Sequence, residues 1–345
     1  MNTRSRTFSF ATAVIVCLPQ LLIAADPKSA ASKPETRPDA DFYLQGEYAT
    51  DFSADPGRSS SIGVQVIALG DGKFEAVEYE GGLPGNGWNR ASPRKYAGET
   101  TSAGRAELAG DGRRLVVRSA RAQIVDDSGK EIARLRKCLR VSPTMGARPP
   151  AGANVLFCGR DAREFVTGTV TLDHFLVAGV DTKEKYGDVT MHLEFRTPYM
   201  PAARGQARGN SGVYIQGRYE VQILDSFGLS GADNECGGLY KQRAPLLNMC
   251  LPPLTWQTYD IEFTAPKFAA DGKKSANARI TVRHNGVAVH DDVEITAKTG
   301  GGAAEAPEAR PLKLQDHGNP VHFRNVWIVE GKVDRRIDDA CNVCR

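Results

Sequence analysis

The chain has 345 residues and a formal net charge of +3; 25% of its residues are charged, 41% are hydrophobic, and it contains 35 glycines and 19 prolines. This composition excludes collagen-like, coiled-coil and wholly disordered proteins, and so small a net charge gives no reason to expect nucleic acid as a partner. The length suits one large domain or two domains of modest size.

The N-terminus predicts a secretory signal peptide over residues 1–25. Two arginines precede an apolar run over 8–23 that ends at two alanines, which is the order of regions in an export signal. Pro19 and Gln20 interrupt the run well short of the roughly 20 apolar residues that a membrane-spanning helix needs. We therefore expect an exported protein, periplasmic or secreted, without a membrane span.

The next segments predict a leader, a first domain and a linker. Residues 26–41 are rich in proline, alanine, serine and charge, which is typical of a flexible leader. From 42 to 141, short alternating runs are separated by turn signals such as Gly70-Asp71-Gly72, so we expect a small β-rich domain. Its role is unknown from the sequence. Three prolines within 142–153 indicate the linker to a second domain.

Residues 154–332 also show a β pattern. Apolar and polar residues alternate over 188–196, which predicts a strand with one buried face. Two further runs flank Asn285-Gly286, a strong hairpin signal. Many short strands joined by such turns favour antiparallel sheets packed face to face. We therefore predict an all-β protein in which a smaller β-rich domain precedes a β-sandwich.

Six cysteines lie beyond the signal peptide. An even number in an exported chain favours disulfides, although six cysteines allow 15 connectivities. Cys236 and Cys250 bracket a loop rich in glycine, proline and asparagine, and they are the pair that we expect first. Cys341 and Cys344 lie in a tail over 333–345, where a terminal staple is favoured over a redox or zinc half-site because no second pair has matching spacing.

The segment 208–225 contains the densest group of polar side chains. Because side chains alternate along a strand, Glu220 and Gln222 share one face. Asp225 has the wrong parity, but the apolar pair Ile223-Leu224 predicts a β-bulge that would turn Asp225 onto that face. The solvated face of an ordinary strand would show the same pattern, since one-sided polar strands are common.

Four spaced motifs in this half resemble the 3-keto-disaccharide hydrolase domain family. They are NSGVY at 210–214, YEVQILD at 219–225, WQTYD at 256–260 and LQDHGN at 314–319, and the resemblance extends over about 154–329. It implies a concanavalin A-like jelly-roll sandwich that acts on 3-keto-glycosides. One departure is Cys158, which stands where the family's opening motif is expected to have an acidic residue.

The chemistry of a 3-keto sugar differs from that of an ordinary glycoside. Retaining glycosidases need two carboxyl groups. Laminarinase-like enzymes have a related motif with a carboxylate at the position that Gln222 occupies here, and an amide cannot titrate as a carboxylate does. In a 3-keto sugar the ketone acidifies the C2 proton, so one base can start elimination of the aglycone, after which water adds back. Glu220 and His317 are our candidate base and acid, in unassigned order; Asp225 is expected to orient either, and Arg196 to stabilise the enolate.

Several further side chains suit the binding of an oligosaccharide or glycoside. They are Gln222, Arg196, Asn210, Tyr214, Gln216, His192, Tyr240 and, ranked lowest because tryptophan is more often a core residue, Trp256. A divalent metal held by His317 with Glu220, Asp225 or His192 would also serve the enolate, but the sequence has no close-spaced ligand motif and the cofactor stays unknown. A non-catalytic carbohydrate-binding module is the alternative function, since fold does not determine activity.

Overall fold

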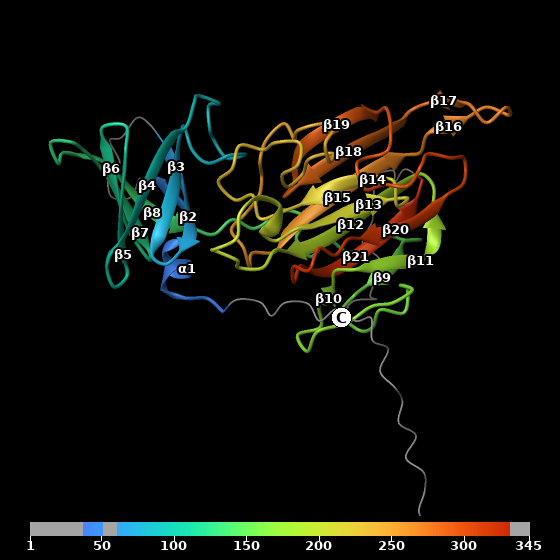
Figure 1. The fold of residues 1–345 in the computed structure, drawn as a ribbon, viewed down its shortest axis with the longest axis horizontal. Coiled ribbons are helices and arrows are strands. Elements are labelled where there is room, and N and C mark those ends of the chain that lie inside the picture. The colour runs from blue at the N-terminus through green and yellow to red at the C-terminus, as the bar shows by residue number, and fades with distance from the viewer. Residues whose placement is uncertain (1–36, 51–60, 332–345) are drawn as a thin grey trace, which may run out of the picture. The chain divides into compact units, whose positions relative to one another are not determined.

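The computed structural model describes residues 37–50 and 61–331 (Figure 1). The expected signal peptide, most of the leader, and Cys341 and Cys344 lie outside these residues. Within them, one short α-helix, α1 (Ala40–Leu44), and one 3-10 turn, η1 (Gly205–Ala207), accompany many strands, and the strands pair antiparallel. The predicted all-β class is therefore confirmed. No helix in the described part of the chain is long and apolar enough to cross a membrane.

The first eight strands form a closed barrel in which each strand pairs with the next and β8 returns to β1 (Figure 1). They are β1 (Gly46–Thr50), β2 (Ile62–Gly70), β3 (Lys73–Glu80), β4 (Arg94–Ser102), β5 (Arg105–Gly110), β6 (Arg113–Arg118), β7 (Arg121–Asp126) and β8 (Glu131–Cys138). Side chains such as Val64, Leu108, Leu115 and Ile124 are fully buried in its interior. Because eight strands leave an interior just wide enough for side chains, the barrel has a packed core.

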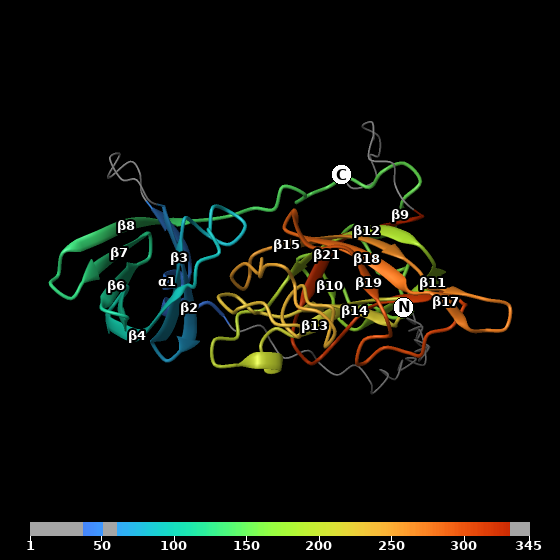
Figure 2. The same ribbon diagram turned by 90° about the horizontal axis from the view of Figure 1, so that it is seen from above.

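Two sheets form the second domain, and in Figure 2 the strands β12, β15 and β18 of one sheet lie above β13 and β14 of the other. The seven-stranded sheet has the order β10-β21-β12-β15-β18-β19, with β9 also paired to β21; the four-stranded sheet has the order β11-β20-β13-β14. The strands are β9 (Asn154–Phe157), β10 (Leu176–Val177), β11 (Val180–Tyr186), β12 (Val189–Arg196), β13 (Ser211–Ile215), β14 (Tyr219–Ile223), β15 (Gln257–Thr264), β18 (Ala278–His284), β19 (Val287–Ile295), β20 (Arg310–Leu314) and β21 (His322–Glu330); β16 (Lys267–Phe268) and β17 (Lys274–Ala276) form a separate pair.

One hydrophobic core lies between these two sheets and determines which side chains face outward. Met191 and Leu193 of β12 and Val221 and Ile223 of β14 belong to the same buried cluster. Since side chains alternate along a strand, the polar residues of β12 and those of β14 point away from the core, on opposite outer faces of the sandwich. The polar residues of β12 and those of β14, which the sequence pattern suggested could form one site, are therefore far apart in the fold.

Two local expectations are wrong. The expected bulge at Ile223-Leu224 is absent from the described ladder, because β14 pairs with β13 without a register shift and ends at Ile223. The expected disulfide between Cys236 and Cys250 is also absent, since both are buried free thiols. The two thiols lie close enough to share a hydrogen bond, and the Cys236 thiol also lies 3.2 Å from the Tyr259 hydroxyl.

The segment between β8 and β9 lies along the outer face of the seven-stranded sheet. Thr144 donates from its hydroxyl to Asp260 of β15 at 2.7 Å, and the Gly146 N–H donates to Glu194 of β12 at 2.6 Å. Arg324 of β21 also donates to Glu194, at 2.6 Å. The bonds of Thr144 and Gly146 hold the connection between the two domains against the sheet, and the bond from Arg324 orients the Glu194 carboxylate.

Candidate active site

Glu220 lies on the outer face of the four-stranded sheet, directly opposite Tyr214 on β13. Its side chain is nearly inaccessible, with the residue 2% exposed. The Tyr214 hydroxyl donates to a Glu220 carboxyl oxygen at 2.6 Å, and the Gln315 amide donates to the Tyr214 hydroxyl at 3.3 Å. The structure thus brings together a carboxyl, a phenol and an amide from three neighbouring strands or their ends.

Gly212 provides the space that the Glu220 carboxyl occupies. A Cβ added at Gly212 would lie 2.3 Å from Glu220 Oε1, closer than real Cβ contacts permit. Gly212 lies opposite Gln222 in the strand pair. Because Gln222 and Glu220 share the outer face of β14, Gly212 lies on that face as well. The close approach gives a physical reason for a glycine within the NSGVY motif.

Burial raises the pKa of Glu220 from its ordinary value to about 7, and the hydrogen bond from Tyr214 opposes the rise. Charged carboxylates are penalised in an apolar environment because they lose hydration. A carboxyl with a pKa near neutral pH can both accept and return a proton, which suits general acid–base chemistry.

Amide side chains lie beside Glu220 on the same face. The Gln222 amide donates to Gln206 Oε1 at 2.9 Å and to Asn210 Oδ1 at 3.4 Å. The Gln222 oxygen is buried and has no hydrogen-bond partner in the described part of the chain. A buried acceptor without a partner is unusual and is suited to a ligand hydroxyl.

A glycine-rich strap over residues 299–302 covers this site. Thr299 Oγ1 accepts from the Glu220 N–H at 2.9 Å and anchors the strap to β14. A Cβ at Gly301 would lie 2.6 Å from the Tyr214 hydroxyl oxygen, and one at Gly300 would lie 3.3 Å from the Tyr240 ring. This strap is not among the predicted site elements, although its three consecutive glycines at 300–302 are a visible signal.

His317 is exposed on the loop that follows β20. Two hydrogen bonds fix the ends of this loop to the start of β13: Gln315 N–H to Gly212 O at 2.9 Å, and Asn210 N–H to Asn319 Oδ1 at 3.2 Å. The loop that follows β20 therefore lies on one side of β13, and β14 lies on the other side of β13. Within residues 61–331, no hydrogen bond connects the imidazole of His317 to Glu220.

Asp225 has a different partner from the one expected. Arg208 donates to Asp225 at 2.7 Å, and both side chains are buried. Arg208 also donates to the carbonyl of Ala68 on β2, at 3.2 Å. Asp225 thus neutralises a buried arginine that contacts the barrel, and it orients neither Glu220 nor His317 through a described hydrogen bond.

Three expected sugar-binding residues lie on the opposite outer face of the sandwich. His192 of β12 is fully buried and bonds to Asp260 at 2.7 Å. The Arg196 guanidinium lies 5.5 Å from the ring centre of Trp256. His192, Arg196 and Trp256 therefore cannot contact the same sugar ring as Glu220 in this fold.

Gln216 has a structural role in the turn between β13 and β14. It adopts a φ of +54°, donates its amide to the Tyr186 carbonyl at 3.0 Å and accepts from Arg218 at 3.0 Å. Asn210, Tyr214, Gln222 and Tyr240 are thus the expected binding residues that the structure gathers near Glu220. Among residues 37–50 and 61–331, no group of three or more His, Cys, Asp or Glu side chains is placed to hold a metal ion.

Comparison with known proteins matches one region of the chain to a protein family. Residues 168–329 match the model of a 3-keto-alpha-glucoside-1,2-lyase-like domain. A candidate glycosyl hydrolase from Parabacteroides distasonis shares 35% identity over 52% of this chain and 84% of its own, with a TM-score of 0.49. A second candidate glycosyl hydrolase from that organism shares 20% identity over 52% of this chain and 94% of its own, with a TM-score of 0.38. No curated protein matches the chain.

Proposed function

We propose that this protein, whose residues 168–329 match the model of a 3-keto-alpha-glucoside-1,2-lyase-like domain, cleaves 3-keto-glycosides with Glu220 as the base. The observation that carries the proposal is a buried carboxyl with a pKa of about 7, held by Tyr214 on the polar face of a sheet. The family match supports a carbohydrate-active enzyme as the broader class.

The proposed reaction begins at C2 of the sugar. The Glu220 carboxylate takes the C2 proton, and the electrons of that C–H bond form an enolate with the C3 ketone. The enolate then expels the aglycone as the C1–O bond breaks, and the leaving oxygen takes a proton from an acid, His317 or the newly protonated Glu220. Water adds across the resulting C1–C2 double bond and gives the free 3-keto sugar.

Tyr214 and Gln222 have supporting roles in this scheme. Burial raises the pKa of Tyr214 well above its ordinary value, so the phenol stays protonated and remains a hydrogen-bond donor to Glu220. Gln222 offers an unpartnered oxygen to a substrate hydroxyl. Because Glu220 is only 2% exposed and Thr299 bonds to its N–H, the 299–302 strap must move for the sugar to reach it.

The proposal is tested by the Glu220→Gln variant. In heavy water, the wild type should exchange deuterium into C2 of a 3-keto-glucoside and release its aglycone, while the parent glucoside is unchanged. Loss of the base should reduce both rates by about 10²–10⁴-fold. Glu294→Gln, on an exposed stretch of β19, is the matched control and should have wild-type rates.

Full activity in Glu220→Gln would refute the assignment of the base. A carbohydrate-binding module without turnover is the second candidate, and the near-complete burial of Glu220 is the observation that favours it. Binding of the 3-keto-glucoside without exchange at C2 would support that candidate.

We also propose, from the N-terminal pattern, that the protein is exported. A mature N-terminus near residue 26 would be the test.

A further inference from the structure

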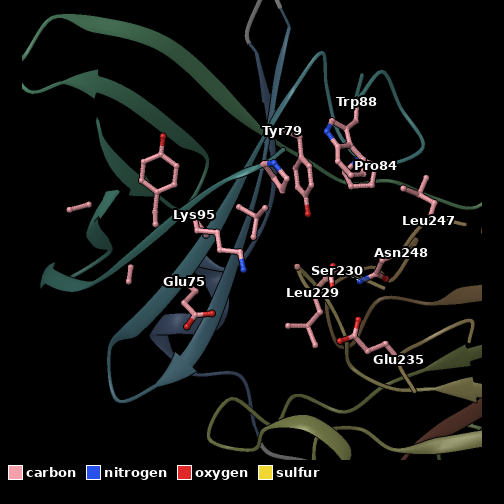
Figure 3. A pocket seen from close by; sticks show the side chains of 17 residues that line it. Glu75, Tyr79, Pro84, Trp88, Lys95, Leu229, Ser230, Glu235, Leu247 and Asn248 are labelled. Carbon is pink, nitrogen blue, oxygen red and sulfur yellow. Dashed lines mark hydrogen bonds between the residues drawn. The ribbon is translucent and has the colours of Figure 1, made fainter. Parts of the chain in front are cut away.

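A pocket of about 550 Å³ lies away from Glu220, between the barrel strands β3 and β4 and the loop that follows β14 (Figure 3). The barrel and the turn after β3 contribute Glu75, Tyr79, Trp88 and Lys95 to its lining. This volume falls within the range of sites for small organic ligands.

Aromatic and aliphatic side chains form much of the pocket wall. The rings of Tyr79 and Trp88 meet edge to face with centres 5.1 Å apart. Leu229 on the sandwich loop is 42% exposed at the pocket, and Leu247 beside it is buried. Such a surface suits the apolar C–H face of a ring-shaped ligand.

Charged and amide groups complete the lining. Glu75 and Lys95 are exposed, and neither has an ion-pair partner in the part of the chain that the structure describes. The Glu235 carboxylate is held in place by the N–H groups of Gly231 and Ala232, at 2.7 and 3.0 Å. In Figure 3 the side chains of Glu75, Lys95 and Glu235 are arranged around the same space as Tyr79.

We propose that this pocket binds a neutral saccharide ring. A wholly apolar ligand would remove water from Glu75, Lys95 and Glu235 without replacing their hydrogen bonds, which costs free energy. An anion is disfavoured because two carboxylates outnumber one amine. A pyranose satisfies both parts of the lining, with its hydroxyls on the charged groups and its C–H face against the rings.

This binding site goes beyond the proposed function, since it lies outside the Glu220 site and needs no oxidised sugar. It also gives the barrel a part in ligand recognition, because Glu75, Tyr79, Trp88 and Lys95 all belong to that half of the chain. The sandwich alone would supply only the loop side of the pocket.

Calorimetric titration of the full chain with trehalose and with methyl α-D-glucopyranoside tests the proposal, because neither probe has a 3-keto group. We expect millimolar binding to the wild type and to Glu220→Gln. Trp88→Ala and Lys95→Ala should each weaken it by about tenfold or more, since each removes a ring face or a donor. Trp256→Ala, on the opposite outer face of the sandwich, should bind as the wild type does.

Binding that is lost in Glu220→Gln but kept in Trp88→Ala would place the sugar at Glu220 and overturn the proposal. Absence of binding by both probes at high millimolar concentration would also overturn it. If Trp88→Ala fails to fold, the exposed Lys95→Ala and Leu229→Ala variants decide the question in the same way. Failure of the proposed function has a separate signature, which is wild-type protein that exchanges no deuterium at C2.

Discussion

Glu220 combines burial with a hydrogen bond from Tyr214, and the two act on its pKa in opposite directions. If Glu220 is the base, kcat/KM for a 3-keto-glucoside should rise with pH and level off above about 7. Tyr214→Phe removes the donor that stabilises the carboxylate, so its rising limb should move to higher pH. The pH–rate profiles of the two proteins check this, and an unchanged limb in Tyr214→Phe would show that another group titrates.

The same residue links stability to pH. Below its ordinary pKa of 4.5, Glu220 is protonated in the folded and unfolded states; as pH rises toward about 7 the unfolded state loses this proton first, so stability falls. The loss is on the order of 3 kcal/mol. Glu220→Gln should therefore be more stable than the wild type by roughly that amount at pH 8, but not at pH 4, as measured by urea unfolding. An equal difference at both pH values would contradict this account.

At the scale of elements, β13 and β14 place the Glu220 carboxyl by leaving room for it at Gly212. Gly212→Ala would put a methyl group 2.3 Å from the present position of Glu220 Oε1, so the carboxyl must move. Moving the carboxyl out of this contact should lower kcat by about 100-fold. Gly187→Ala is the matched control, because a Cβ there meets no atom within 4 Å, and it should retain wild-type kcat in the same assay.

Local patterns predicted several elements well because hairpins and face alternation depend on neighbouring residues. Asn285-Gly286 does join β18 to β19, and the alternation over 188–196 corresponds to β12 with its apolar side in the core. Alternation cannot tell to which sheet a strand belongs, since that depends on pairing with distant segments. His192 and Glu220 both read as outward polar residues, yet they lie on opposite faces of the sandwich.

At the scale of the whole molecule, barrel closure and the 299–302 strap also escaped the sequence analysis. Closure requires β1 to pair with β8. This pairing places Glu47 opposite Cys138, although most of the sequence of the first domain lies between these two residues. An open sheet and a closed barrel have the same alternating pattern, so only the distant pairing distinguishes them. The strap reaches Glu220 from a loop 79 residues further along the chain.

The connection between the domains gives a prediction at this scale through Glu194. Burial acts to raise the pKa of Glu194, but hydrogen bonds from His192, Asn325, Arg324 and the Gly146 N–H outweigh it and lower the pKa to about 2. A depressed pKa adds stability above pH 4.5, on the order of 3 kcal/mol, which is lost as the pH falls toward 2. Glu194→Gln should lose about that much at pH 7 in urea unfolding.

The matched control for this variant is Glu294→Gln, whose carboxylate is exposed on β19 and which should change stability by less than about 0.5 kcal/mol. The difference between Glu194→Gln and the wild type should shrink as the pH is lowered toward 3. A difference that is the same at pH 7 and pH 3 would mean that the carboxylate charge does not hold the connecting segment.

The pairing of the strands has a consequence for contacts between separate copies of the chain. The barrel closes on itself, and both edges of the four-stranded sheet are capped: Gln222 of β14 bonds to Gly237 and Gly238, and β11 bonds to residues 164–166. At one end of the seven-stranded sheet, β19 has an acidic stretch over 291–294. Free backbone edges template fibril growth, and charge on an edge strand repels an incoming strand. The capped and charged edges named here therefore disfavour edge-to-edge pairing with another copy of the chain.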